Sequence, residues 1–182
     1  MLAWPPDPEA WSLRWYRNMI GDCSAEVVSS TVPCSTKWMK GTVNSFYIGI
    51  IATFIATVLG TMAALGLSRP HMPYKALIMS ILISPMIVPL IITAAGMFFF
   101  YARINLVYTF TGVILAHVAL ATPFVVITVT ATLVGFDMNM VKAAQSLGAK
   151  PMRTFFKVIM PLILPGIISG ALFAFITSFD EV

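Results

Sequence analysis

Apolar residues are gathered into four long blocks that contain no Asp, Glu, Lys or Arg. The blocks cover residues 41–68, 76–102, 104–136 and 158–179. Each exceeds the roughly 20 residues that a helix needs to cross a bilayer. The strands of membrane barrels alternate apolar and polar residues over shorter segments, so helices are the structure that satisfies the backbone here. The pattern predicts an all-α integral membrane protein, with a bundle of about four to five transmembrane helices.

The predicted organisation is an extracytoplasmic lead over residues 1–40 and a transmembrane domain over residues 41–182. The expected spans are residues 42–67, 77–101, 110–135 and 159–180. Composition agrees, since the 182 residues are 59% hydrophobic and 10% charged. Soluble domains carry roughly 25% charged residues, so a soluble fold is excluded. The net charge of +4 comes without a basic face or a stacking module, and no nucleic-acid partner is expected.

Basic residues are unevenly divided among the loops, which predicts the orientation of the chain. The loop between the second and third spans has only Arg103. The other two loops contain Arg69, Lys75, Lys142, Lys150, Arg153 and Lys157. Loops rich in Lys and Arg stay in the cytoplasm, so residues 68–75 and 137–157 are expected there and both termini outside. The chain is therefore expected to be a multi-pass membrane protein.

The lead segment is polar and rich in aromatic residues. Trp11, Trp15 and Tyr16 favour a short helix in the membrane interface. The lead has no signal-peptide features, and a preceding span would export it, so we expect one span before this segment. Cys23 and Cys34 lie in the same external part, where a disulfide or two free thiols are both open alternatives. Their spacing, without a nearby His, does not indicate a metal site.

The first and fourth spans carry small residues at intervals of four, which predicts helix faces that pack closely. These residues are Ala52, Ala56, Gly60 and Ala64, then Gly166, Gly170 and Ala174. Prolines in three spans predict kinks; they are Pro85, Pro89, Pro123, Pro161 and Pro165. His117 lies in mid-span, where it is either a functional group or a neutral side chain bonded to a neighbouring helix.

The segment 137–157 has helical periodicity twice, which predicts a helix–turn–helix in the cytoplasm. The two apolar stripes are Met140, Ala143, Ala144 and Leu147, then Met152, Phe155, Phe156 and Ile159. Asp137 or Asn139 can cap the first helix, and Gly148 can end it. Pro151 suits the first turn of the second helix. The other face of the second helix has Lys150, Arg153 and Lys157.

Such a pair of stripes favours docking into a groove on a soluble partner, although an inert intracellular loop remains an alternative. At this point the sequence resembles a known family. Residues 142–151 (KAAQSLGAKP) and 155–166 (FFKVIMPLILPG) are similar to the EAA motif of ATP-binding-cassette importer permeases. The resemblance implies that this loop holds a coupling helix, which docks on the ATP-binding subunit.

The resemblance also implies roles for single residues. Ala143, Ala144 and Gly148 match the small residues of the motif, and Leu147 matches its apolar position. Pro161, Pro165 and Gly166 match the start of the next span. Lys142 stands where the family usually has Glu. A cation near a helix N-terminus is disfavoured by about 0.3–1 kcal/mol, so Lys142 is expected to weaken the first helix or alter the partner contact.

Residues 11–16, 63–69 and 178–182 are most similar to the spermidine/putrescine branch, in which one span precedes and another follows this region. The resemblance implies a location in a bacterial cytoplasmic (inner) membrane and a path for a small solute, here a polyamine. The partners it implies are a dimer of cytoplasmic ATP-binding subunits, a second permease and an extracytoplasmic solute-binding protein, with membrane lipid around them. Asp180 and Glu181 are candidate substrate-path residues for cationic cargo; the alternative is the solvated start of a loop.

No catalytic constellation is present in the sequence. It lacks a Gly-x-x-x-x-Gly-Lys-Ser/Thr loop, so ATP hydrolysis is expected on a separate subunit. Its two histidines, His71 and His117, lie in different environments, and neither a Ser/His/Asp nor a metal cluster is expected. The chain is therefore expected to be a transport subunit without a cofactor. The alternatives are a membrane scaffold that does not transport and an inactive permease fragment.

Overall fold

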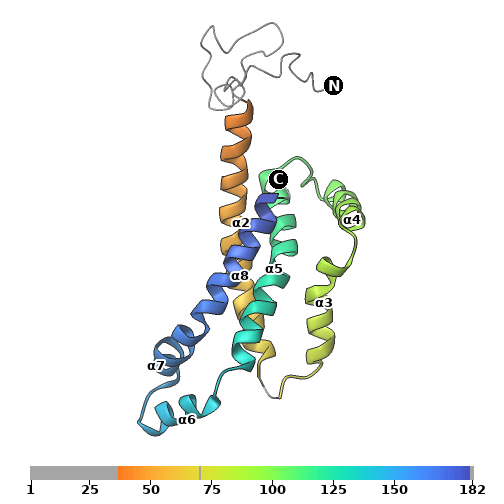
Figure 1. The fold of residues 1–182 in the computed structure, drawn as a ribbon. Helices are drawn as coiled ribbons and strands as arrows, with labels where there is room; N and C mark the ends of the chain where they lie inside the picture. Colours follow the sequence, from red (N-terminus) through yellow and green to blue (C-terminus); the bar gives the residue numbers. More distant parts are fainter. Residues whose placement is uncertain (1–36, 70, 181–182) are drawn as a thin grey trace, which may run out of the picture. The chain divides into compact units, whose positions relative to one another are not determined.

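A computed structural model describes residues 37–69 and 71–180, and this part of the chain contains helices and no strand. The helices follow one another along the chain, as Figure 1 shows. They are α2 (Lys37–Leu67), α3 (Lys75–Ile87), α4 (Leu90–Arg103), α5 (Phe110–Val134), α6 (Met138–Ser146), α7 (Pro151–Thr154), a π-helix η1 (Phe155–Ile159) and α8 (Met160–Asp180). The predicted all-α class is confirmed.

The chain divides into two units, Met1–Phe46 and Tyr47–Val182. Of the first unit the structure describes only residues 37–46, which form the opening turns of α2. The predicted interfacial helix, Cys23, Cys34 and Glu181 lie outside the described residues. The buried core lies within the second unit.

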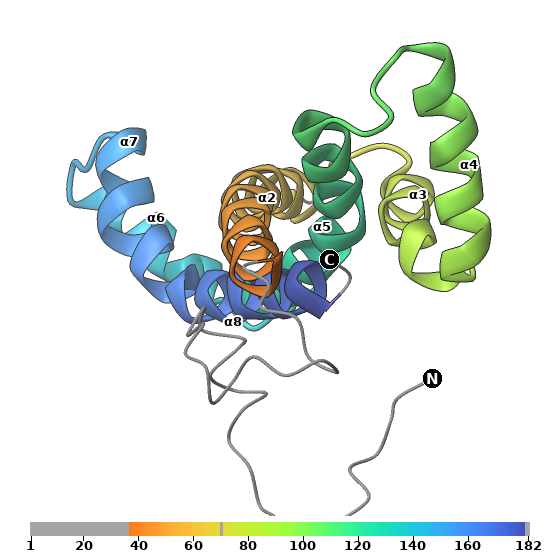
Figure 2. The same ribbon diagram turned by 90° about the horizontal axis from the view of Figure 1, so that it is seen from above.

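The core of the second unit is formed where α2, α5 and α8 cross (Figures 1 and 2). Small residues of α2 and α8 face valines of α5. The buried cluster consists of Ala52, Ala56, Ala64, Val118, Ala121, Val125, Val129 and Ala174. Without a hydrophobic driving force between helices in lipid, close van der Waals packing of this kind is what holds them together.

The predicted small-residue faces lie where the helices approach each other most closely. A Cβ built on Gly60 would lie 2.7 Å from the Val125 Cβ, which is closer than side chains tolerate. A Cβ on Gly170 would lie 2.5 Å from the Thr128 Oγ1 and 3.0 Å from the Val125 Cα. α5 thus contacts both neighbours through positions where only glycine fits, and the predicted packing faces are confirmed.

The second predicted span is a broken pair of helices. α3 and α4 are bent by 102° relative to each other at Val88 and Pro89. Val88 has the extended backbone, with ψ 134°, that a following proline favours, and Pro89 has no N–H to continue the helix. Pro85, by contrast, lies inside α3 without ending it. A kink was predicted here, but the change of direction is far larger than a proline kink (Figure 2).

Three described helices are long and apolar enough to cross a membrane, and a fourth span is added if α3 and α4 form one. Helix directions alternate, so the second unit has two ends. Figure 1 places the loop from α2 to α3 at the same end as α6 and α7. The loop from α4 to α5 and the end of α8 lie at the opposite end. The two loops rich in basic residues therefore share one side, as the predicted orientation requires.

Candidate functional site

The first helix of the predicted coupling segment is α6, and its start is fixed by a side-chain cap. The Asn139 N–H donates to the Asp137 Oδ1 at 2.9 Å. Asp137 itself has extended backbone, as a capping residue requires. Of the two predicted capping residues, Asp137 is thus the one used.

The end of α6 is a Schellman turn at Gly148. The Gly148 N–H donates to the Gln145 carbonyl at 2.9 Å, and the Ala149 N–H donates to the Ala144 carbonyl at 3.1 Å. Gly148 has φ +80°, which an L side chain adopts only with strain. The predicted helix stop is confirmed, and the turn sends the chain back into α7.

The second helix of the segment begins with Pro151 at its first turn, as predicted, and continues without interruption into the membrane. Between α7 and α8 lies the π-helix η1, Phe155–Ile159. Pro161 lies two residues after the end of η1, and a proline ring clashes with the carbonyl four residues earlier, here that of Lys157. Opening the hydrogen-bond ladder to five residues at this point relieves that conflict. The sequence predicted a kink at Pro161 but not its form.

Most residues of the predicted apolar stripe of α6 are exposed in the described part of the chain. Leu147 is 89% exposed and Met140 is 49% exposed. Ala143 is also exposed, and Ala144 is half-buried. Among the α6 side chains whose burial the structure describes, Val141 is the buried one, and the predicted stripe did not include it. Val141 and Ala144 are three residues apart and so share one face. α6 as a whole is in contact with α7 and η1.

Lys142 lies in the second turn of α6, because the helix starts at Met138. The field of the helix dipole fades beyond the first turn, so the predicted penalty of a cation does not apply at this position. The Lys142 side chain is exposed, and its carbonyl accepts a hydrogen bond from the Ser146 hydroxyl at 3.0 Å.

Asp180 is the last residue of α8 and is exposed. Two residues before it, the buried Ser178 Oγ lies 3.0 Å from the His117 Nδ1 of α5. Only 7% of His117 is exposed. The contact agrees with the interpretation of His117 as a side chain bonded to a neighbouring helix, and it links α5 to α8. No group of three or more His, Cys, Asp or Glu residues that could hold a metal occurs in the described chain.

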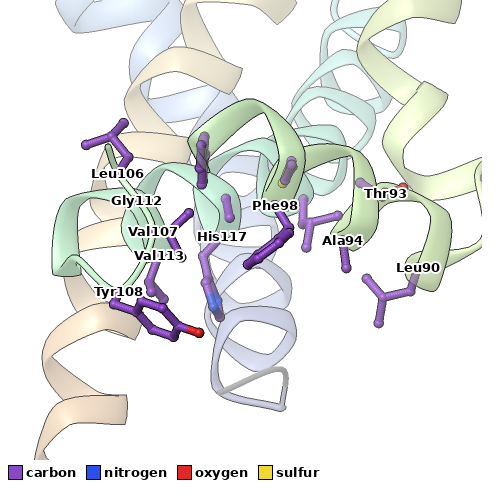
Figure 3. A pocket seen from close by; sticks show the side chains of 14 residues that line it. Leu90, Thr93, Ala94, Phe98, Leu106, Val107, Tyr108, Gly112, Val113 and His117 are labelled. Atoms are coloured by element: carbon purple, nitrogen blue, oxygen red, sulfur yellow. The ribbon is translucent and has the colours of Figure 1, made fainter. Parts of the chain in front are cut away.

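A cavity of about 330 Å³ lies between α4 and α5, with His117 in its wall (Figure 3). The sequence did not predict it, because it exists only where α4 turns back at Val88. The loop that closes it is held by Thr109, whose hydroxyl donates to the Leu106 carbonyl at 2.7 Å and accepts from the Gly112 N–H at 3.0 Å. Tyr108, at its rim, has φ 60° and a side chain that is 99% exposed.

Residues 56–182 match the family described as the binding-protein-dependent transport system inner membrane component. This range includes the capped helix α6, the Schellman turn and the spans α5 and α8. The chain belongs to this family. It is accordingly a multi-pass protein of the cytoplasmic membrane, and the predicted localisation is confirmed.

Relatives of this permease family carry the names of different solutes. The chain is 32% identical to the spermidine/putrescine transport system permease protein PotC of Haemophilus influenzae, over all of this chain (100%) and 64% of that protein. It is 28% identical to PotC of Escherichia coli, over 96% of this chain and 61% of the relative. It is 34% identical to the trehalose transport system permease protein SugB of Mycobacterium tuberculosis, over 76% of this chain and 51% of that protein.

The resemblance to importer permeases, with the spermidine/putrescine branch among the relatives, is thus confirmed. The chain spans less than two thirds of the length of these relatives.

Proposed function

We propose that the chain is a membrane-spanning subunit of an ATP-binding-cassette importer and that it couples to a cytoplasmic ATP-binding subunit through α6. The observation that carries the proposal is the uncovered face of Met140, Ala143 and Leu147 on a helix whose two ends are both fixed. An apolar helix face that is exposed outside the membrane suits a groove on a soluble partner. Lys142, Ala143, Ala144 and Leu147 form the proposed coupling surface, and Gly148 sets the turn that ends it.

The work proposed for this subunit is alternating access. Closure of an ATP-bound partner dimer would move α6, and the spans would follow as rigid bodies around a central path. A second permease supplies the other half of that path, and an extracytoplasmic binding protein delivers the solute. A polyamine is the proposed cargo, supported by the names of relatives that match 100% and 96% of this chain, against 76% for the trehalose permease. Asp180 and Glu181 are proposed to favour cations at the outer end.

Copurification from native membranes in mild detergent tests the coupling proposal. We expect a soluble ATP-binding subunit to copurify with the wild-type chain and to be lost or strongly reduced with Leu147→Ser. Val134→Ser is the matched control, since Val134 is 79% exposed but lies at the end of α5. A well-inserted wild-type chain without an ATPase, or equal loss in both variants, contradicts the proposal and favours a scaffold or an inactive fragment.

Uptake of labelled spermidine by cells with the complete importer tests the cargo. Saturable uptake that trehalose does not inhibit is the expected result. Saturable uptake of trehalose, without polyamine uptake, overturns the cargo and leaves the permease class unchanged.

A further inference from the structure

The cavity between α4 and α5 is lined by one face of each helix. On α4 the lining positions recur at helical spacing, and they are Leu90, Thr93, Ala94, Met97, Phe98 and Tyr101. The opposite wall consists of Gly112, Val113, Ala116, His117 and Leu120 of α5. The volume of about 330 Å³ is within the range of small-molecule sites. The two main walls of the cavity are therefore each formed by one face of a helix.

Three aromatic side chains, Phe98, Tyr101 and Tyr108, line this one cavity. Figure 3 shows Phe98 and Tyr108 directed toward the space beside His117. The faces of aromatic rings carry negative potential and attract ammonium groups, and aromatic cages are a common site for such cations. Among the described residues the lining contains no Asp, Glu, Lys or Arg, and Arg103, the one basic residue of α4, is not part of it.

The rest of the lining selects among the solutes named for the relatives. Leu90, Met97 and Leu106 offer apolar contact to methylene groups. Hydrogen-bonding side chains of the described lining are confined to Thr93, Tyr101, Tyr108 and His117, which are too few for a disaccharide with a hydroxyl on most carbons. An alkyl chain that ends in an ammonium group fits both parts of the wall.

The wall of the cavity is also tied to α8. His117 lies 3.0 Å from the Ser178 Oγ of that helix, which fixes the position of its ring. A transport site must also release its solute, so rings without a buried carboxylate suit a site of passage.

We propose that the α4–α5 cavity binds an alkylammonium cation, with Phe98, Tyr101 and Tyr108 around the ammonium group and the apolar residues against its methylenes. The proposal rests on the proposed polyamine permease function and assigns a site for the cargo.

Equilibrium binding of labelled putrescine to the full chain in nanodiscs, at fixed ionic strength, tests the site. Each of Phe98→Leu, Tyr101→Leu and Tyr108→Leu is expected to weaken binding about two- to fivefold. Tyr101→Phe keeps the ring and is expected to bind as the wild type does. Phe99→Leu is the matched control, because Phe99 is on α4 and exposed but does not line the cavity.

Competition separates charge recognition from simple apolar filling of the cavity. Tetramethylammonium is expected to displace putrescine. Butanediol, which is the neutral isostere of putrescine, is not expected to displace it. Displacement by butanediol, unchanged affinity in all three Leu variants, or an equal loss with Phe99→Leu overturns the cavity as an ammonium site.

The two proposals fail separately. If the complete importer takes up polyamine but the Leu variants bind putrescine with unaltered affinity, the proposed cavity site is overturned and the proposed cargo stands. If the complete importer takes up trehalose and no polyamine, the proposed polyamine cargo is overturned.

Discussion

At the scale of single residues, Gly148 separates two effects that are usually mixed. Its φ of +80° strains any L side chain, yet a Cβ built on it meets no atom of the described chain within 4 Å. A substitution there therefore changes the backbone preference of the turn without a collision. The cost of the left-handed conformation for an L-residue is about 1–2 kcal/mol.

We expect Gly148→Ala and Gly148→Leu to weaken association with the ATP-binding subunit by a similar factor, about tenfold, since both act through the backbone. Gly148→Asn is expected to lie near the wild type, because Asn tolerates the left-handed region. Affinity measured by surface plasmon resonance on the solubilised chain decides this. A much greater loss for Leu than for Ala would show that the partner contacts Gly148 directly.

Ser178 and His117 offer a second measurement at this scale. Removal of the hydroxyl in Ser178→Ala is expected to destabilise the bundle by about 0.6–1.7 kcal/mol, the range for hydrogen bonds between membrane helices. Reversible unfolding in mixed micelles measures it. Ser169→Ala is the control, because Ser169 is exposed on the same helix. Equal stability of the two variants would indicate that the contact of 3.0 Å contributes nothing to the fold.

At the scale of elements, the features that follow local rules could be predicted from the sequence. Asp137, Gly148 and Pro151 each have a residue type that suits one cap or turn, and each occupies it. The bend of 102° and the π-helix could not be predicted. A proline indicates that the helix is interrupted, but not whether the backbone bends, breaks or forms a π-helix there. The cavity depends on that bend, so it was also beyond prediction. Val141 was missed because neighbouring elements decide which face of α6 is buried.

Pro89→Ala tests what holds α3 and α4 apart. It returns the missing N–H, so we expect the two helices to straighten. Spin labels at the exposed positions Ile81 and Phe99 report the change by pulsed electron resonance. In one continuous helix the two labelled positions would be about 27 Å apart along the axis, and in the bent pair of helices the distance between them is shorter. Pro85→Ala is the control, because Pro85 already lies within a continuous helix. An unchanged distance in Pro89→Ala would place the cause of the bend in tertiary contacts.

The α5–α8 contact gives a second prediction for elements. Gly170→Ala forces a Cβ against Thr128 and Val125, and we expect a destabilisation of about 1–3 kcal/mol. Gly66→Ala meets no described atom within 4 Å and is expected to be neutral or slightly stabilising, through helix propensity. Unfolding in micelles compares them, and the account of the packing fails if Gly170→Ala is as stable as Gly66→Ala.

At the scale of the whole molecule, orientation in the membrane follows from charge. The loop from α2 to α3 and the α6–α7 segment share one end of the second unit, and both are rich in basic residues. From the positive-inside rule we propose that this end lies in the cytoplasm. In that orientation the loop from α4 to α5, and with it the rim of the cavity, would face outward, where the proposed binding protein would deliver its solute.

Single cysteines at two exposed tyrosines test this orientation, in a background with Cys23 and Cys34 changed to Ser. Tyr108 is 99% exposed and Tyr74 is 78% exposed. We expect a membrane-impermeant maleimide to label Tyr108→Cys in intact spheroplasts and Tyr74→Cys only after permeabilisation. The reversed pattern would invert the topology and place the proposed coupling surface outside the cell.

The glycines that face α5 have a consequence for how the molecule can move. Gly166 and Gly170 leave no side chain between α8 and α5, and the hydroxyls of Thr128 and Thr132 occupy the space instead. Interlocked in this way, the two helices cannot slide along each other without a collision, because sliding needs side chains that can yield. We expect the two helices to move as one unit, which the His117–Ser178 contact also links. If α6 couples to a partner as proposed, its displacement would then tilt α5 and α8 together, unless the π-helix η1 between α7 and α8 bends first.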